Sequence, residues 1–334
     1  MGSLFVRGAR ALALRHIRRL TPVTDRGAPD RVSRIYRQME SEFGMFAPPV
    51  ALHAASPEVL EAVWLVLRET LVAGDPADRR AKEAVAAAVS ARNSCPYCVE
   101  VHGAALTGLG PGRNGDDDPR IAAARRWAVG EGPSPFPPAV TVTQIGVVVA
   151  FHHINRMVNL FLAESPLAPM PPGAWPVGRR VAPLLLGRLA RAGATPGAAV
   201  GMLPPRELPA DLGWAAPVPV IADALSRGCG AIDEAGAAVV PEEVRELVLC
   251  RLADPAERGP GLSAGPWLDE ALRGLAERHR PAGRLALLTA FASYRVTDSD
   301  VAGLGKADDE TLVRFTAWAS MAAARRAGRV LGSG

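Results

Sequence analysis

The segment Asn93–His102, with the sequence NSCPYCVEVH, holds the side chains best suited to chemistry. Cys95 and Cys98 are two of the four cysteines of the chain, and His102 follows the second of them by four residues. On a helix, positions 95, 98 and 102 lie on one face, with the Cβ atoms of Cys98 and His102 roughly 5–6 Å apart. A thiol beside an imidazole has a proton acceptor close by, so this segment predicts redox or metal chemistry.

The cysteine pair allows three interpretations. Redox chemistry is favoured, because an i, i+3 pair forms a disulfide after a small adjustment of the first turn, and the start of a helix stabilises a thiolate. A structural zinc half-site is the second, although zinc takes four ligands and Glu83 would have to join Cys95, Cys98 and His102. Two buried cysteines without a role are the third. Cys229 and Cys250 have no partner at a useful spacing and are expected to be small buried residues.

Glu83 lies next to an apolar stretch, residues 84–89, that predicts a buried helix. A carboxylate in such a place needs a partner, because burying it alone costs free energy. His102 would be a suitable partner. An exposed Glu83 that pairs with Arg79 at the start of the helix fits the pattern equally well.

Four polar residues share one face of the long apolar segment 141–163. They are His152, Asn155, Arg156 and Asn159. Either they form a solvated stripe, or they are the polar wall of a pocket in which Arg156 pairs with Glu83 or another acid.

The composition favours an all-α fold. Of the 334 residues, 49% are hydrophobic and only 5% are aromatic, and no segment shows the alternation typical of a strand. Caps, prolines and apolar periodicity predict helices, some of them after clear signals such as Ser56-Pro57-Glu58. The expected ranges are 56–72, 77–92, a helix that starts near 95, 119–129, 141–163, 179–192, 220–227, 241–253, 266–279, 281–295 and 308–331, with loops at 108–118 and 130–138.

The chain is predicted to have four parts. A basic N-terminal arm spans 1–30, a catalytic domain 31–192, a Pro/Gly-rich linker 193–219 and a second helical part 220–334. The arm is expected to pack on the body or fray, with binding to a membrane surface or partner as the alternative. Residues 290–295 align with 87–92, so the second part is interpreted as a degenerate repeat of the first. Asp298 and Val301 then stand where the cysteine pair does, so the copy lacks its chemistry.

Charge and cysteine content argue against several classes. The net charge is +4, and no basic stripe alternates with aromatic residues, so a nucleic-acid partner is not expected. Residues 1–20 lack the uninterrupted apolar core of a secretory signal, and no stretch is long and apolar enough to predict a membrane span. A Cys-x-x-Cys pair in a cysteine-poor chain fits a reducing compartment, so we expect a cytoplasmic protein.

The chemical residues match a known signature. Glu83, eleven residues, Cys95-Pro96-Tyr97-Cys98, three residues and His102 resemble the alkylhydroperoxidase D-like proteins of the carboxymuconolactone decarboxylase superfamily. The later Asn155-Arg156 pair is also similar to that family. The resemblance covers about residues 45–162, and the second half resembles the family only as a degenerate repeat.

The resemblance implies an all-α fold, homo-oligomers and peroxidase or disulfide-reductase chemistry without haem, metal or another cofactor. By position, Cys98 corresponds to the cysteine that attacks peroxide and becomes a sulfenic acid. Cys95 corresponds to the resolving partner and proton donor, and Glu83 with His102 to a proton relay. The family also contains decarboxylases and lyases that lack the cysteine pair, so its presence here favours the redox branch.

The sequence therefore predicts a thiol-dependent hydroperoxidase, an oxidoreductase in which a Cys95–Cys98 disulfide is restored by an external dithiol or protein reductant. One alternative is a disulfide relay that serves a peroxiredoxin and meets no peroxide itself. Others are a non-enzymatic helical scaffold and a carboxymuconolactone decarboxylase-like lyase.

Overall fold

Helices build nearly all the regular structure of the computed structural model, which describes residues 8, 10–24, 26–110, 118–168 and 170–333. Within these residues the only β-type pairings are two isolated bridges, Ile17 with Leu162 and Ala73 with Ala194. The predicted all-α class is confirmed. Most of the predicted loop 108–118 lies outside the described residues.

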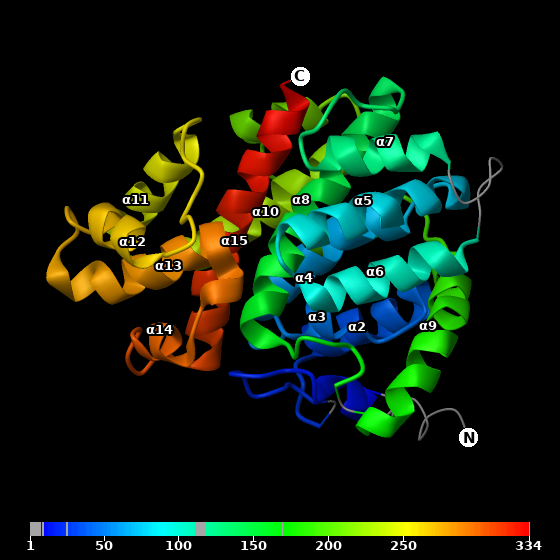
Figure 1. The fold of residues 1–334 in the computed structure, drawn as a ribbon, viewed down its shortest axis with the longest axis horizontal. Coiled ribbons are helices and arrows are strands. Elements are labelled where there is room, and N and C mark those ends of the chain that lie inside the picture. Colours follow the sequence, from blue (N-terminus) through cyan, green and yellow to red (C-terminus); the bar gives the residue numbers. More distant parts are fainter. Residues whose placement is uncertain (1–7, 9, 25, 111–117, 169, 334) are drawn as a thin grey trace.

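The described residues of the first half contain the helices α2 to α9, which Figure 1 shows in blue to green. They are α2 (Asp30–Gln38), α3 (Pro48–Ala51), α4 (Pro57–Leu67), α5 (Arg79–Arg92), α6 (Pro96–Gly108), α7 (Pro119–Ala128), α8 (Pro138–Phe161) and α9 (Trp175–Ala190). A proline stands in the first turn of α3, α4, α6, α7, α8 and α9, where its missing N–H costs nothing. These prolines explain why most helix starts were predictable.

The second half forms six helices, drawn from green to red in Figure 1. They are α10 (Pro219–Ala237), α11 (Glu242–Ala253), α12 (Gly265–Ala271), α13 (Arg280–Ala292), α14 (Asp298–Ala302) and α15 (Asp309–Gly332). The prediction that the first of these helices spans 220–227 is wrong, because α10 continues past Gly228. A Cβ atom at Gly228 would lie 2.6 Å from Val66 Cγ2, so this glycine lets α10 approach α4 closely. Its role is in packing, not in ending the helix.

Two antiparallel contacts join the halves. α4 packs on α10, and α8 packs on α15, with Ser320 donating to the His153 carbonyl at 2.9 Å. Buried apolar side chains form one cluster that extends from Leu14 to Ala324. α5 packs on α8 as α13 packs on α15, which is the arrangement expected of a duplication. The duplication and the four-part division both remain predictions.

The described part of the N-terminal arm packs on the end of α8. Arg18 donates its backbone N–H to the Phe161 carbonyl at 2.7 Å, and Arg19 forms an ion pair with Asp298 at 2.6 Å. His16 is buried, with its ring edge-on to that of Tyr97. The arm therefore covers the start of α6, close to the cysteine pair.

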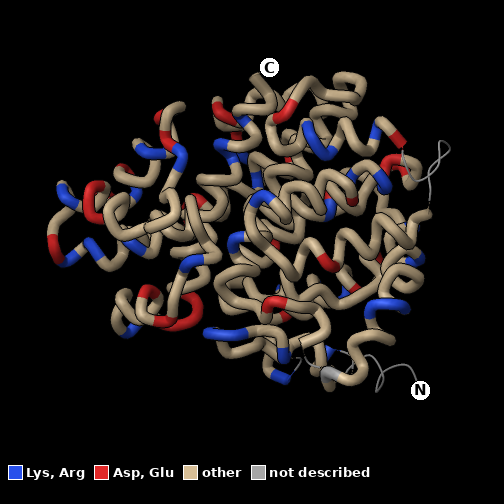
Figure 2. The backbone as a smooth tube through the Cα atoms, viewed as in Figure 1, with Lys and Arg blue, Asp and Glu red and all other residues tan. Residues whose placement is uncertain are grey.

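Charged residues are interspersed over the backbone, and Figure 2 shows no large face of one sign. None of the described helices is both long enough and apolar enough to cross a membrane.

His53 and His153 are stacked in the core where α3 meets α8, with ring centroids 5.4 Å apart. Burial lowers the pKa of His53 to about 4, against a slight opposing effect of its hydrogen bond to the Val50 carbonyl. Burial, with the charges of His53 and Arg156, also lowers the pKa of His153. Both rings are therefore neutral in the folded protein at neutral pH.

Acidification should destabilise the protein through these rings. The pKa of His53 is near 6.5 in the unfolded chain and about 4 in the folded protein. Between these two values the unfolded state binds a proton that the folded state does not, so the free energy of unfolding falls as pH is lowered across this window. We expect a loss of roughly 2 kcal/mol from His53 alone between pH 7.5 and 5. Urea unfolding of wild type and His53→Leu measures it. The same loss in both proteins would contradict the assignment.

Candidate active site

The two cysteines stand at the turn between α5 and α6. Asn93 ends α5, Ser94 takes a left-handed conformation with φ 51°, and Cys95 is the N-cap of α6. Pro96 occupies the first helical position of α6, and Cys98 occupies the third. Both thiols are free and buried, with exposed fractions of 0% and 1%. The turn thus places the pair side by side inside the protein.

The environment of Cys98 differs from the predicted one. Burial raises the pKa of Cys98 well above the ordinary thiol value, and the neighbouring Cys95 raises it further, whereas a hydrogen bond from the Asn155 side chain lowers it. The expectation that the helix start and His102 would favour a thiolate is therefore wrong for this resting state. Moving a thiolate out of water costs more free energy than its interaction with the start of the helix contributes.

The other two cysteines, Cys229 and Cys250, differ from each other in burial. Cys229 is fully buried, as expected, and burial raises its pKa. Cys250 is exposed, so the expectation that it is buried is wrong. It lies on the outer face of α11, where the sequence pattern gave no sign of which side would meet the core.

Glu83 is buried, with 1% of its side chain exposed, and it binds two partners at once. One oxygen accepts a hydrogen bond from Arg79 Nε at 2.8 Å, and the other lies 2.6 Å from His102 Nδ1. Burial alone would raise the pKa of Glu83, but the charges of His102 and Arg79 and their hydrogen bonds lower it to about 2. The two interpretations of Glu83 are thus both partly correct, since it is buried and pairs with His102 as well as Arg79.

His102 is held on two sides. Its Nδ1 faces the Glu83 carboxylate, and its ring lies edge-on to that of Phe151, with centroids 4.5 Å apart. With Nδ1–H directed at the carboxylate, Nε2 keeps a lone pair and can accept a proton. Among the described contacts, no hydrogen bond joins His102 to Cys98 directly.

An amide network connects α5, α8 and α13 beside the cysteines. Asn155 donates to Ser90 Oγ and accepts from Asn93 Nδ2, both at 3.0 Å. Asn159 donates to the Asn93 carbonyl and to Ser293 Oγ, also at 3.0 Å. Asn155 is the member that reaches Cys98. The two asparagines therefore fix the cysteine turn against α8.

His152 and Arg156 lie on the same face of α8, next to the two asparagines, and line a cleft. Arg156 donates to the Ala290 carbonyl at 3.0 Å, and its NH1 lies 2.9 Å from His152 Nδ1. Arg156 does not pair with Glu83, so that expectation is wrong. The four polar residues of α8 form no solvated stripe. Two of them order the cysteine turn, and two form a polar wall.

Sequence reasoning missed several members of this site. Ser90, Ser293 and Phe151 contact the predicted residues but have no motif of their own. Ser90 and Phe151 could have been found only from their position on the buried faces of α5 and α8. Within the described chain, no group of three or more His, Cys, Asp and Glu side chains could hold a metal ion, so the zinc alternative has no ligand set there.

Comparison with known proteins shows to which family this chain belongs. The family model of the carboxymuconolactone decarboxylase family matches residues 57–130, which include Glu83, both cysteines of the pair and His102. A protein of Mycobacterium tuberculosis named alkyl hydroperoxide reductase is 36% identical over 341 residues, covering 96% of each chain. The chain belongs to the carboxymuconolactone decarboxylase family. No solved structure matches it significantly.

The family model matches only part of the chain. The matched segment ends at residue 130, before α8, so Asn155 and Asn159 of the amide network lie outside it. The similarity to the mycobacterial protein extends over both halves. The second half is therefore a feature that this family member shares with at least one relative.

Proposed function

We propose that this protein is a thiol-dependent hydroperoxidase. The observation that carries the proposal is the placement of two buried, free thiols in one turn, with His102 one helical turn further along α6 and fixed by a buried carboxylate. The name of the mycobacterial relative supports the same activity.

In the first step, the Cys98 thiolate attacks one oxygen of a hydroperoxide and the O–O bond breaks. Cys98 becomes a sulfenic acid, and the released alkoxide takes up a proton to leave as an alcohol. In the second step, Cys95 attacks the Cys98 sulfur, a disulfide forms and water leaves. Two electrons and two protons from an external dithiol or protein reductant then restore both thiols.

We assign Glu83 and His102 to the proton transfers. His102 Nε2 accepts the proton that Cys98 must lose and returns it to the leaving oxygen, while Glu83 stabilises the charged ring. Since no hydrogen bond joins Cys98 to His102 in the described contacts, this transfer needs a water molecule or a small movement of the Cys98 side chain. Burial of both thiols favours reaction with the peroxide group of a small-molecule substrate over direct attack by the thiol of a relay protein.

Mass spectrometry with a sulfenic-acid trap tests the proposal. After exposure to hydroperoxide, Cys95→Ser should carry the trap on Cys98, and wild type should instead yield a Cys95–Cys98 disulfide. Trapping should be faster at pH 9 than at pH 7, because burial raises the Cys98 pKa and keeps the thiol protonated at neutral pH. Cys229→Ser is the matched control and should behave as wild type. Trapping on Cys250 alone would refute the assignment.

The relay makes a separate prediction about non-additivity. Glu83→Gln and His102→Gln should each lower kcat, and the double variant should be little slower than the worse single variant, because the two side chains act as one unit. Steady-state peroxide consumption measures this. Defects that multiply would show that Glu83 acts independently of His102.

We also expect a homo-oligomer, as the resemblance implies. α9 presents an apolar stripe to solvent, formed by Val177, Val181, Leu184 and Leu185. A second copy could cover such a stripe. Light scattering should give a molar mass above that of one chain for wild type and a lower one for Leu184→Asp. A monomeric wild type would remove this expectation. A cytoplasmic location remains a prediction.

A further inference from the structure

A cleft of about 980 Å³ lies where α8, α13 and α15 meet the end of α11. Its volume is at the upper end of the roughly 300–1,000 Å³ that small-molecule sites occupy. Five arginines from both halves of the chain contribute to its lining. They are Arg92, Arg156, Arg258, Arg326 and Arg329.

The positive charge of the cleft is not neutralised within it. Glu257 is the only carboxylate among the described lining residues, and its oxygens already accept hydrogen bonds from Arg251, Trp267 and the Gly259 N–H. Arg326 donates to the carbonyls of Asp254 and Glu257 at 2.9 and 3.0 Å. Arg156 and Arg258 likewise donate to main-chain carbonyls. Neutral carbonyls hold these guanidinium groups in place but leave their charge unbalanced.

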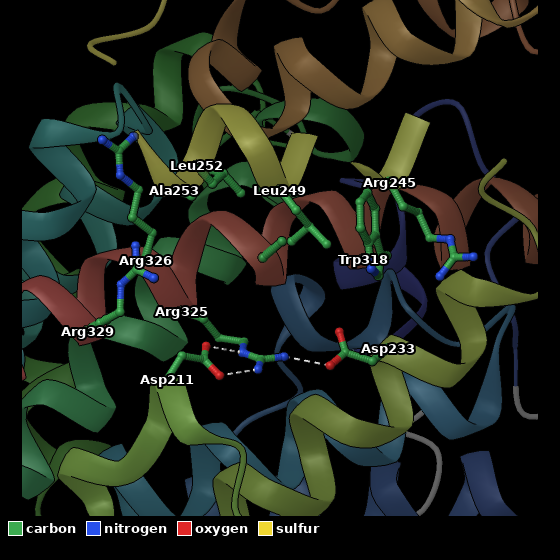
Figure 3. Close-up of a pocket in the computed structure, with 11 residues that line it drawn as sticks. Asp211, Asp233, Arg245, Leu249, Leu252, Ala253, Trp318, Arg325, Arg326 and Arg329 are labelled. Atoms are coloured by element: carbon green, nitrogen blue, oxygen red, sulfur yellow. Dashed lines mark hydrogen bonds and ion pairs between the residues drawn. The ribbon is translucent and has the colours of Figure 1, made fainter. Parts of the chain in front are cut away.

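Arg325, the residue before Arg326 on α15, is an arginine whose charge is balanced by carboxylates. Arg325 forms ion pairs with Asp211 and Asp233, each at 2.5 Å. Figure 3, which shows an adjoining pocket, draws its guanidinium between these two carboxylates. Burial and the charges of Arg258 and Arg329 lower the pKa of Arg326, although Glu257 opposes them. Like charges close together store repulsion that an incoming anion would relieve.

Much of the remaining lining of the cleft is apolar. Val148, Leu252, Phe291 and Val330 line it, with several alanines between them. A cleft with cationic and apolar parts fits a ligand that has an acidic group on a hydrocarbon body, and it fits a small inorganic anion poorly.

One end of the cleft reaches the cysteine site. Asn93, two residues before Cys95, lines the cleft, and its amide donates to Asn155 Oδ1 at 3.0 Å. The Asn155 side chain also lowers the pKa of Cys98. The Asn93–Asn155 pair therefore connects the cleft wall with the surroundings of the proposed attacking sulfur, which does not itself line the cleft.

We propose that this cleft binds the organic part of the substrate, and that the substrate is a hydroperoxide bearing a carboxylate on an apolar body. The arginines hold the carboxylate, the apolar wall holds the body, and the asparagine end directs the peroxide group toward Cys98. The proposal of an anion site depends only on the observed cleft. The proposal that this site binds the substrate also depends on the proposed function.

Calorimetric titration with octanoate tests the anion site without any turnover. Wild type should bind octanoate, and octan-1-ol much more weakly. Arg326→Gln should weaken octanoate binding by about tenfold or more, as expected for one lost charge-assisted hydrogen bond. Arg329→Gln gives a second test if Arg326→Gln folds poorly, because Arg329 is exposed. Arg273→Gln, also exposed and outside the cleft, is the matched control and should bind as wild type.

Turnover tests the role in substrate binding. For wild type and Arg273→Gln, kcat/KM should be higher for a fatty-acid hydroperoxide than for tert-butyl hydroperoxide, and Arg326→Gln should lower that ratio about tenfold. Equal binding of octanoate and octan-1-ol, or equal effects of Arg326→Gln and Arg273→Gln, would overturn the anion site. A protein that binds octanoate through these arginines but consumes neither hydroperoxide would overturn the proposed function and leave the anion site in place.

Discussion

The structure depends on the burial of α8 from several sides. This helix packs on α5 through Asn155 and Ser90, and on α15 through the His153 carbonyl and Ser320. Because buried polar groups must be paired, each polar side chain on α8 limits where its neighbours can lie. Asn155 and Asn159 fix the cysteine turn, and Arg156 binds the last part of α13 through the Ala290 carbonyl. One helix thus determines the positions of the thiols and of the second half.

The site balances burial against reactivity. Glu83 keeps its negative charge inside the protein because Arg79 and His102 both contact it, and their attraction exceeds the cost of leaving water. Cys98 has no cationic partner among the groups that shift its pKa, so burial keeps it protonated. In the proposed mechanism, His102 accepts the proton of this buried thiol, and access to Cys98 is the step that selects a substrate.

The second half contributes shape and charge where the first half contributes the thiols. It lacks a Cys-x-x-Cys pair, yet Ser293 at the end of α13 completes the amide network. α13 and α15 also supply one wall of the arginine-lined cleft. Arg325 is balanced by Asp211 and Asp233, but Arg326 beside it is not. A single turn of α15 thus carries one structural arginine and one whose charge remains available.

The sequence by itself determined the helical class and most helix starts, and it proposed Glu83, Cys95, Cys98 and His102 as the candidate site. These depend on local signals, such as prolines in first turns and fixed spacings along one helix, which survive in any tertiary arrangement. The continuation of α10 past Gly228, the burial that raises the Cys98 pKa and the exposure of Cys250 could not be predicted. Each depends on which distant segment covers a residue. Only the tertiary structure decided that Arg156 faces the second half and not Glu83, because hydrogen-bond partners such as the Ala290 carbonyl are 134 residues away in the chain.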